Sequence, residues 1–167
     1  SIETRKAEFV ELMIREVGQP VPAADGEVER ALAILRYYSQ VALDENGSTY
    51  PGSTPGAQVV VRREPLGVIL AICPWNFPLA IPLWKAAPAL AYGNAVIIKP
   101  ASPAIATAAL LHECAEEALP AGVLGQLVMS GAQAGELLDD ERIAAASFTG
   151  STEVGLSVAE RLARRAA

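Results

Sequence analysis

The sequence predicts an α/β protein with a parallel sheet that has helices on both faces. Three times between residues 67 and 155, an apolar run typical of a buried strand ends in a turn rich in Pro, Gly, Ser or Asn, and a helical pattern follows. The apolar runs are residues 67–72, 95–99 and 144–148. Open parallel sheets bind ligands at the carboxyl ends of their strands, so the turns after these runs are the expected functional region. The side chains expected to converge there are Asn76, Lys99, Ser102 and Ser151.

Two amphipathic helices are expected before the sheet. In the first, at about residues 3–17, apolar side chains recur at helical spacing, and Gly18 followed by Pro20 supplies a stop. The second is expected at about residues 25–43, where another apolar stripe recurs. Because such stripes are nearly always core contacts, we assign no chemistry to either helix.

The segment between these helices and the sheet is expected to lie on the surface. Residues 45–56 are dense in turn-forming residues and are expected to form a surface connection. A short strand is expected at residues 59–61, because three valines follow one another there. It ends at the charged residues 62–64.

Proline and serine mark the first two helices of the alternating region. The first crossover helix is expected at about residues 79–91, kinked or broken near Pro88. The second is expected to begin with Ser102 as its N-cap and Pro103 at its first helical position, and to end before Pro120.

One more strand and two helices complete the expected pattern. Residues 126–129 are expected to form a fourth strand, and Gly131 is expected to open a short helix that runs through residue 138. The last helix is expected from residue 151 or 152 to about residue 163.

Composition excludes several classes of protein. A chain of 167 residues with 51% hydrophobic and 19% charged residues can bury a sizeable core, so disorder is not expected and the length indicates one domain or part of a larger one. The net charge of -6 gives no general attraction for nucleic acid or an anionic membrane surface. The most apolar window, residues 67–84, contains three prolines and Asn76, so it is not expected to span a membrane.

The two cysteines, Cys73 and Cys114, indicate a reducing compartment. They lack the spacing of metal ligands and the chain has one His, so no metal site is expected. Cys73 directly follows a strand, and a buried structural thiol is the favoured interpretation because no basic residue nearby would lower its pKa. No export signal is visible, so a cytoplasmic location is expected. The chain opens on Ser1 rather than Met, which suggests a missing start.

The turn at residues 149–155 allows two interpretations. Free amide groups at a helix N-terminus, the close approach allowed by Gly150, and the Ser151 hydroxyl together suit a phosphate or pyrophosphate. The alternative is a plain capped helix start, because the G-x-G-x-x-G fingerprint is absent from the chain.

Lys99 and Ser102 also allow either a structural or a binding role. Lys99 closes a strand where a ligand would lie, although a solvent-exposed strand end with the lysine stem packed on the sheet is the alternative. In a nucleotide site Ser102 would lie near the adenosine ribose. Unlike a carboxylate, it would not repel a 2′-phosphate.

Asn76 lies in a turn bracketed by Pro74 and Pro78, which restrict the backbone. A preorganised amide donor suits the stabilisation of an oxyanion. The alternative is an Asn that satisfies only the hydrogen bonds of its own turn.

Taken together, several motifs resemble the aldehyde dehydrogenase family in type, order and spacing. They are Glu64-Pro-Leu-Gly67, Pro74-Trp-Asn-Phe-Pro78, Gly93-Asn94, Lys99-Pro-Ala-Ser102, Pro120-Ala-Gly122 and Phe148-Thr-Gly-Ser-Thr-Glu-Val-Gly155. The resemblance covers nearly the whole chain, including the two N-terminal helices, and implies the family's Rossmann-like cofactor domain. It divides the chain into a helical lead at residues 1–44, a hairpin or linker segment at 45–64, and a Rossmann-like core at 65–167. Residues 48–63 correspond to part of the family's oligomerisation hairpin.

The resemblance implies that this domain binds NADP or NAD. Trp75 would line the pocket, Lys99 would meet the adenosine ribose, and Gly131 would lie near the adenine. Gly150 and Ser151 would lie at the pyrophosphate. The full set of matching cofactor-binding positions is Ile72, Pro74, Trp75, Asn76, Lys99, Ala101, Ser102, Gly131, Thr149, Gly150, Ser151 and Gly155.

Two of these positions have more specific implications. Asn76 matches the family's oxyanion-hole amide and is the one catalytic residue expected in this chain. Ser102 stands where NAD-preferring members often have Glu, and the Lys-Pro-Ala-Ser motif is similar to the succinate-semialdehyde dehydrogenase branch, so NADP is slightly favoured.

The family's nucleophilic Cys and general-base Glu belong downstream of the last helix. The chain therefore resembles a fragment that lacks the catalytic domain and would be inactive alone. The complete enzyme is expected to oxidise a small aldehyde to an acid, as a homodimer or homotetramer. Which aldehyde it oxidises is not indicated. The alternatives are a naturally truncated module that holds a dinucleotide, an acylating member that uses coenzyme A, and a related phosphate-reducing member.

Overall fold

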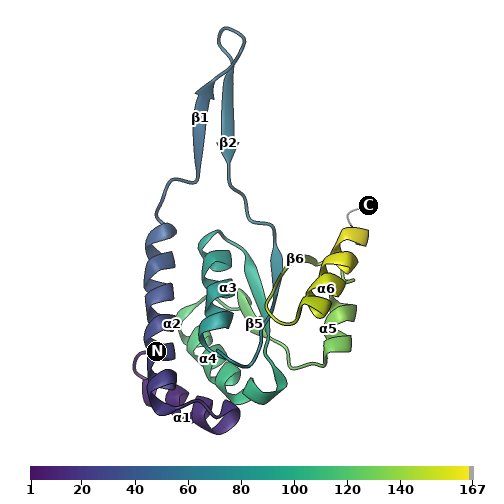
Figure 1. The fold of residues 1–167 in the computed structure, drawn as a ribbon. Helices are drawn as coiled ribbons and strands as arrows, with labels where there is room; N and C mark the ends of the chain where they lie inside the picture. The colour runs from purple at the N-terminus through teal and green to yellow at the C-terminus, as the bar shows by residue number, and fades with distance from the viewer. Residues whose placement is uncertain (166–167) are drawn as a thin grey trace.

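The computed structural model describes residues 1–165, in which a thin hairpin projects from an α/β domain (Figure 1). The elements are α1 Lys6–Val17, α2 Val21–Val41, β1 Gly47–Pro51, β2 Gln58–Arg62, β3 Val68–Ile72, α3 Ala80–Ala91, β4 Ala95–Lys99, the 3-10 helix η1 Ser102–Ala104, α4 Ile105–Ala118, β5 Leu124–Gln126, α5 Gly131–Leu137, β6 Ile143–Phe148 and α6 Thr152–Arg165. The alternation of strands and helices from β3 onward confirms the predicted α/β class.

Four parallel strands form the main sheet, in the order β5-β4-β3-β6. Along the chain the strands advance from β3 through β4 to β5, and β6 then pairs with the other side of β3. The direction of winding therefore reverses between β3 and β6, which is where open α/β sheets bind their ligands. Ile72 at the end of β3 pairs with both Lys99 and Phe148. The carboxyl ends of β3, β4 and β6 therefore lie at the same level of the sheet.

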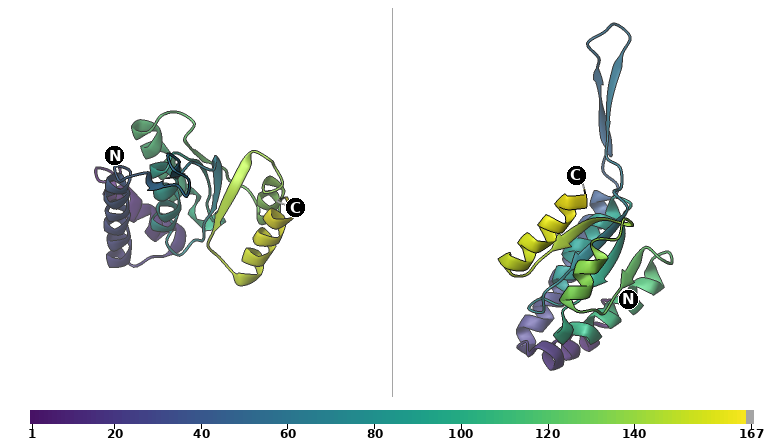
Figure 2. Two further views of the ribbon diagram at one scale, coloured as in Figure 1. Left: turned by 90° about the horizontal axis from the view of Figure 1, so that it is seen from above. Right: turned by 90° about the vertical axis from the view of Figure 1, so that its right-hand side faces the viewer.

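Helices cover both faces of this sheet, as predicted. α3 and α4 pack on one face, and α1 and α2 pack outside them. α5 and α6 lie on the other face (Figure 2). Successive residues of β3 point to opposite faces: Ile69 and Ala71 enter the larger core cluster, while Leu70 joins the smaller cluster with Leu138 and Val158.

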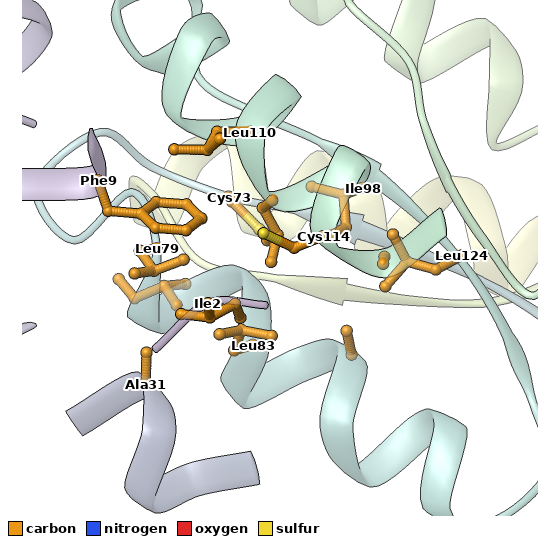
Figure 3. Packing of buried hydrophobic residues seen from close by; sticks show 14 of the residues in the cluster. Ile2, Phe9, Ala31, Cys73, Leu79, Leu83, Ile98, Leu110, Cys114 and Leu124 are labelled. Atoms are coloured by element: carbon orange, nitrogen blue, oxygen red, sulfur yellow. The ribbon is translucent and has the colours of Figure 1, made fainter. Parts of the chain in front are cut away.

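The larger core cluster joins the N-terminal helices to the sheet (Figure 3). Phe9 from α1 and Ala31 from α2 belong to the same buried cluster as Leu83 from α3, Ile98 from β4 and Leu110 from α4. This confirms the prediction that the apolar stripes of the first two helices are core contacts. It also fixes both helices beside the crossover helices α3 and α4.

Residues 47–62 form an exposed two-stranded antiparallel hairpin, in line with the hairpin that the family resemblance implied at residues 48–63 and with the surface location expected for residues 45–56. β1 pairs with β2 over five residues on each strand. The turn-forming residues lie at its tip, where Gly56 adopts a φ of 84°. Every residue of both strands is exposed. The residue pattern alone indicated only the second of these strands, because an exposed hairpin strand needs no apolar alternation.

The second helix begins earlier than expected. α2 starts at Val21 rather than near residue 25, with Pro20 at its N-cap and Pro22 in its first turn. Proline is tolerated there because the first N–H groups of a helix have no intrahelical partner. α3 runs without a break through Pro88, where the sequence suggested a kink or break.

The fourth strand is shorter and earlier than the predicted residues 126–129. β5 ends at Gln126, although the Leu127 N–H still donates to the Ile98 carbonyl at 3.0 Å. The chain then leaves the sheet because Ser130 begins α5 with a capping box.

No helix within residues 1–165 is long and apolar enough to cross a bilayer.

Candidate functional site

The turns after the four parallel strands emerge at one edge of the sheet. The backbone pairing continues past the strands, since the Cys73 N–H donates to the Lys99 carbonyl and the Thr149 N–H donates to the Ile72 carbonyl, both at 3.1 Å. The predicted site residues all lie at the strand ends, in these turns or just beyond them. Ile72 and Lys99 are the last residues of β3 and β4. Pro74, Trp75 and Asn76 follow β3, Ala101 and Ser102 follow β4, Gly131 begins α5, Thr149, Gly150 and Ser151 follow β6, and Gly155 lies in the first turn of α6.

The turn after β6 lies directly on the aromatic ring of Phe148. A β-carbon built at Gly150 would lie 2.6 Å from Phe148 Cζ, and one at Gly155 would lie 3.2 Å from Cε1. Both distances are shorter than ordinary van der Waals contact, so this packing requires glycine, or nearly so, at both positions. The backbone is thereby left bare of side chains beside an open concavity. The concavity is lined by Phe148, Thr149, Gly150, Ser151, Thr152, Gly155 and Leu156.

The N-terminus of α6 borders this concavity and keeps backbone donors free. The Ser151 hydroxyl accepts a long hydrogen bond of 3.4 Å from the Val154 N–H. The N–H groups of Thr152 and Glu153 find no acceptor among residues 1–165. The two interpretations of this turn are therefore compatible, because Ser151 caps the helix weakly while two amide donors remain for an anion.

The N-terminus of α3 is closed by a carboxylate from α2. Glu27 Oε1 accepts from the Leu79 N–H at 2.8 Å and from the Ala80 N–H at 2.9 Å. Glu27 is only 2% exposed. The carboxylate satisfies the free donors and complements the positive end of the helix dipole, so no external anion is needed there.

The N-terminus of α4 is closed in the same way by Glu16 of α1. Its two carboxylate oxygens accept from the backbone N–H groups of Ala106 at 2.6 Å and Thr107 at 2.7 Å, and the Thr107 hydroxyl donates to it at 2.7 Å.

The predicted N-cap role of Ser102 is therefore wrong. Ser102 begins the 3-10 helix η1 without a side-chain cap, and Ala101 precedes it. Its hydroxyl is exposed and makes no capping bond, which leaves it free for a ligand.

The N-terminus of α5 is capped in part by its own capping box. Ser130 Oγ accepts from the Gln133 N–H, and the Gln133 side chain accepts from the Ser130 N–H. Within residues 1–165, α5 and α6 each keep two N–H groups without an acceptor, those of Gly131 and Ala132 in α5 and those of Thr152 and Glu153 in α6. Glu27 and Glu16 close α3 and α4. α6 begins beside the switch point between β3 and β6, whereas α5 has only seven residues and begins at the edge strand β5, so the turn at residues 149–153 is the better candidate for a phosphate group. The S-x-x-Q pattern of this capping box is visible in the sequence, but the box was not predicted. No sequence pattern near Glu16 or Glu27 indicates that their carboxylates cap other helices.

The turn after β3 presents its polar side chain to solvent. Asn76 and Trp75 are exposed, and Trp75 is 56% exposed. The structure records no hydrogen bond from the Asn76 amide within residues 1–165, whereas its backbone carbonyl accepts from Gln19 Nε2 at 3.0 Å. The alternative, in which the side chain satisfies its own turn, therefore has no support, and the amide is available as a donor.

Lys99 and Gly131 lie at the other end of the same edge. Lys99 is half-buried at the last position of β4, three residues before Ser102. A β-carbon at Gly131 would meet nothing within 4 Å. The structure therefore leaves open space at Gly131 but does not itself require glycine there.

Cys73 is buried, as predicted, and its surroundings explain why it is not a nucleophile. Burial raises the pKa of the Cys73 thiol to about 12, while the positive charges of Lys85 and Lys99 act in the opposite direction. The expectation that no basic residue lies nearby was wrong, but the burial outweighs both lysines.

Lys85 was not identified from the sequence. It lies on α3, and its Nζ donates to Ser147 Oγ of β6 at 3.1 Å. Burial lowers the pKa of Lys85. A lysine in an apolar helix carries no local signal, so only the packing of α3 against the end of β6 reveals the contact.

The comparisons with known proteins agree with this geometry. The family model described as the aldehyde dehydrogenase family matches residues 1–167. The chain is 42% identical to an alpha-ketoglutaric semialdehyde dehydrogenase of Bacillus subtilis, over 99% of this chain and 34% of that protein. It is also 42% identical to a 2,5-dioxopentanoate dehydrogenase of Saccharolobus solfataricus, over 92% of this chain and 33% of that protein.

A solved structure with bound cofactor is also similar. It is an NADP-dependent glyceraldehyde-3-phosphate dehydrogenase of Bacillus halodurans complexed with NADP, with a TM-score of 0.89 and 35% identity, covering 96% of this chain and 35% of that one. The chain thus spans about a third of the length of the curated relatives and of this solved chain. The match of the family model over the whole sequence, together with these identities, shows that the chain belongs to the aldehyde dehydrogenase family.

Proposed function

We propose that the protein containing this chain oxidises an aldehyde to a carboxylic acid with NADP or NAD, and that this chain supplies cofactor binding and the oxyanion donor Asn76. The observation that supports this most directly is the open N-terminus of α6 beside the switch point of the sheet. α6 offers the free N–H groups of Thr152 and Glu153, whereas Glu27 and Glu16 close α3 and α4, and the seven-residue helix α5 begins at the edge strand β5.

The residues at this edge fit a dinucleotide. The bare backbone over Phe148 allows a pyrophosphate to approach the α6 N-terminus closely. Lys99 and the exposed Ser102 lie at the neighbouring strand end, where the adenosine ribose would lie. The bound dinucleotide supplies the acceptor for the hydride that leaves the aldehyde carbon.

Asn76 would act on the oxygen of the substrate. As a nucleophile adds to the aldehyde carbon, negative charge develops on that oxygen, and the Asn76 amide N–H would donate to it. The buried thiol of Cys73 is not suited to be the nucleophile, because its pKa is raised to about 12. We place the nucleophile and the general base in the two-thirds of the relatives' length that this chain does not match.

Both NADP preference and substrate class belong to the proposal. Ser102 brings no negative charge to the ribose position, which favours NADP over NAD slightly. The similar structure from Bacillus halodurans is described with NADP bound. The curated relatives are named for semialdehydes that also carry a carboxylate, and we propose an aldehyde of this class.

We also propose that the hairpin joins two or more subunits, as a homodimer or homotetramer. Val59, Val60 and Val61 are about half exposed, at 50%, 57% and 51%. An isolated two-stranded hairpin is marginally stable in water, and exposed apolar strands invite pairing. Contact with another subunit would cover these valines.

The experiment is an assay of the full-length polypeptide that contains this chain, with NADP and NAD each offered with carboxylate-bearing and plain aldehydes. We expect aldehyde-dependent reduction of both cofactors, with a higher kcat/KM for NADP and for carboxylate-bearing substrates. Tight NADP binding without turnover of any aldehyde would favour the alternative of a non-catalytic dinucleotide-binding protein. Product formation only in the presence of coenzyme A would favour an acylating reaction.

A further inference from the structure

We propose that Gln19 and Glu27 are positioning residues that hold Asn76 in place for the reaction; this inference rests on the proposed function. The two residues lie in the connection between α1 and α2 and in α2, more than 45 positions before Asn76 in the chain. They reach the turn after β3 and the start of α3 through three hydrogen bonds, and a fourth joins them to each other.

The turn from Cys73 to Leu79 is held at three points. At its start, the Cys73 N–H donates to the Lys99 carbonyl at 3.1 Å. At its centre, the Asn76 carbonyl accepts from Gln19 Nε2 at 3.0 Å. At its end, Glu27 Oε1 accepts from the Leu79 N–H at 2.8 Å. Only the central bond fixes the backbone of Asn76 itself.

Gln19 links the centre of the turn to its end. Besides the Asn76 carbonyl, Gln19 Nε2 also donates to Glu27 Oε2, at 2.6 Å. Both partners are acceptors, so the amide of Gln19 must present its nitrogen and not its oxygen to them. Glu27 then connects this amide to the start of α3 through its other oxygen. The position of the Asn76 carbonyl is therefore coupled to the N-terminus of α3.

The contact has a cost that packing alone does not explain. Gln19 Oε1 is buried and has no hydrogen-bond partner within residues 1–165. A buried polar atom without a partner is destabilising, and such groups in a native protein call for an explanation. We infer that the two donor bonds are retained because they orient the turn. The Asn76 side chain is exposed, so its direction depends on the backbone that Gln19 holds.

The test measures kcat and KM in the full-length polypeptide. Gln19→Met keeps an unbranched side chain of similar length and removes both donors. Small displacements of a catalytic group lower rates steeply, so we expect kcat to fall about tenfold, with KM for NADP little changed. Gln19→Lys offers an ammonium that can donate to both Glu27 and Asn76 and has no unpartnered oxygen, so we expect near-normal kcat.

A double-mutant cycle separates positioning from a structural role. If Gln19 acts through Asn76, then Gln19→Met lowers kcat in the normal background but has almost no further effect in an Asn76→Ala background. Asn94→Ala is the matched structural control. Its side chain accepts from the Leu66 and Gly67 N–H groups and donates to the Ala89 carbonyl at the amino end of the sheet, so it should lower stability without lowering kcat.

The outcomes distinguish this inference from the proposed function. If Asn76→Ala keeps normal turnover, the oxyanion role fails and the positioning role fails with it. If Asn76→Ala is slow but Gln19→Met turns over normally, only the positioning role is overturned. An equal loss from Gln19→Met in both backgrounds would also overturn it, because the effect would not pass through Asn76. If Gln19→Met does not fold, normal turnover by Gln19→Ala would overturn it, and a tenfold loss confined to the normal background would support it.

Discussion

The ring of Phe148 lies so close beneath Gly150 that a β-carbon there would sit 2.6 Å from the ring carbon Cζ. This contact explains why the turn after β6 has no side chain between the backbone and the adjacent concavity. It also connects the last residue of a core strand, whose ring packs in the smaller hydrophobic cluster, to the proposed cofactor site. The geometry of the site therefore depends on the packing of one aromatic side chain.

Gly150→Ala should weaken NADP binding. The added methyl must displace the Phe148 ring or the turn, so we expect the Kd to rise about tenfold or more, equivalent to about 1.4 kcal/mol. Isothermal titration calorimetry on the full-length polypeptide measures this. Gly26→Ala in α2 is the control, since a β-carbon there meets nothing within 4 Å and should be harmless or slightly stabilising. Unchanged affinity in Gly150→Ala would show that the bare backbone is not required.

Ser102→Glu should shift the cofactor preference toward NAD. A carboxylate at this exposed position would repel the 2′-phosphate of NADP and could accept from the free 2′-hydroxyl of NAD. We expect the ratio of kcat/KM for NADP to that for NAD to fall about tenfold, which corresponds to about 1.4 kcal/mol. Ser102→Gln is the control for size without charge. A Glu variant that prefers NADP as strongly as the unmodified protein contradicts the placement of Ser102 at the ribose.

The buried thiol of Cys73 predicts a loss of stability at high pH. Burial raises the pKa of Cys73 to about 12 from an ordinary value of 9.0, so the folded protein holds this proton more tightly than the unfolded chain. Its contribution to stability is full below about pH 9 and is lost as the pH rises toward about 12, at up to about 1.4 kcal/mol per pH unit.

Urea unfolding at several pH values, compared between the unmodified chain and Cys73→Ala, measures this contribution. Other groups also titrate at high pH, so the difference between the two proteins is the relevant quantity. We expect the advantage of the unmodified chain to shrink above pH 9. A difference in unfolding free energy that stays constant with pH would show that the thiol is not held protonated by burial.

Removal of the hairpin should dissociate the complete protein into subunits without unfolding the sheet domain. The two ends of the hairpin are adjacent, since the Arg63 N–H donates to the Asn46 carbonyl at 2.9 Å. A short Gly-Ser linker can therefore replace residues 47–62. Analytical ultracentrifugation measures the mass, and circular dichroism checks the fold. A variant that keeps the mass of the unmodified protein would place the subunit contact elsewhere.

Strands, helices and the functional edge of the sheet were predictable because their signals are local. Buried β3 and β4 are apolar runs, and the turn after β6 contains both glycines that pack on Phe148. The exposed strand β1 was indicated only by the family resemblance, because no apolar alternation marks a hairpin without a buried face. Ser102 was misassigned as a helix cap because a serine before proline is a typical cap, whereas Glu16 supplies the cap from another helix.

Long-range contacts of this kind also hid the residues around Asn76. Nothing near Glu27 in the sequence indicates that its carboxylate is buried at the start of α3, and nothing near Gln19 points to the Asn76 carbonyl. Both contacts follow from how α1 and α2 pack beside α3. The sequence can therefore indicate a candidate group for the chemistry, whereas the folded chain is needed to show which residues contact that group.

The most direct test of the account is the turnover and cofactor affinity of Asn76→Ala in the full-length polypeptide. If Asn76 donates to the developing oxyanion, kcat should fall about 100-fold or more. The Kd for NADP should change little, because the proposed cofactor contacts are made mainly by the turns after β4 and β6. Wild-type kcat in this variant would contradict the central claim that the turn after β3 stabilises the charge formed on the aldehyde oxygen.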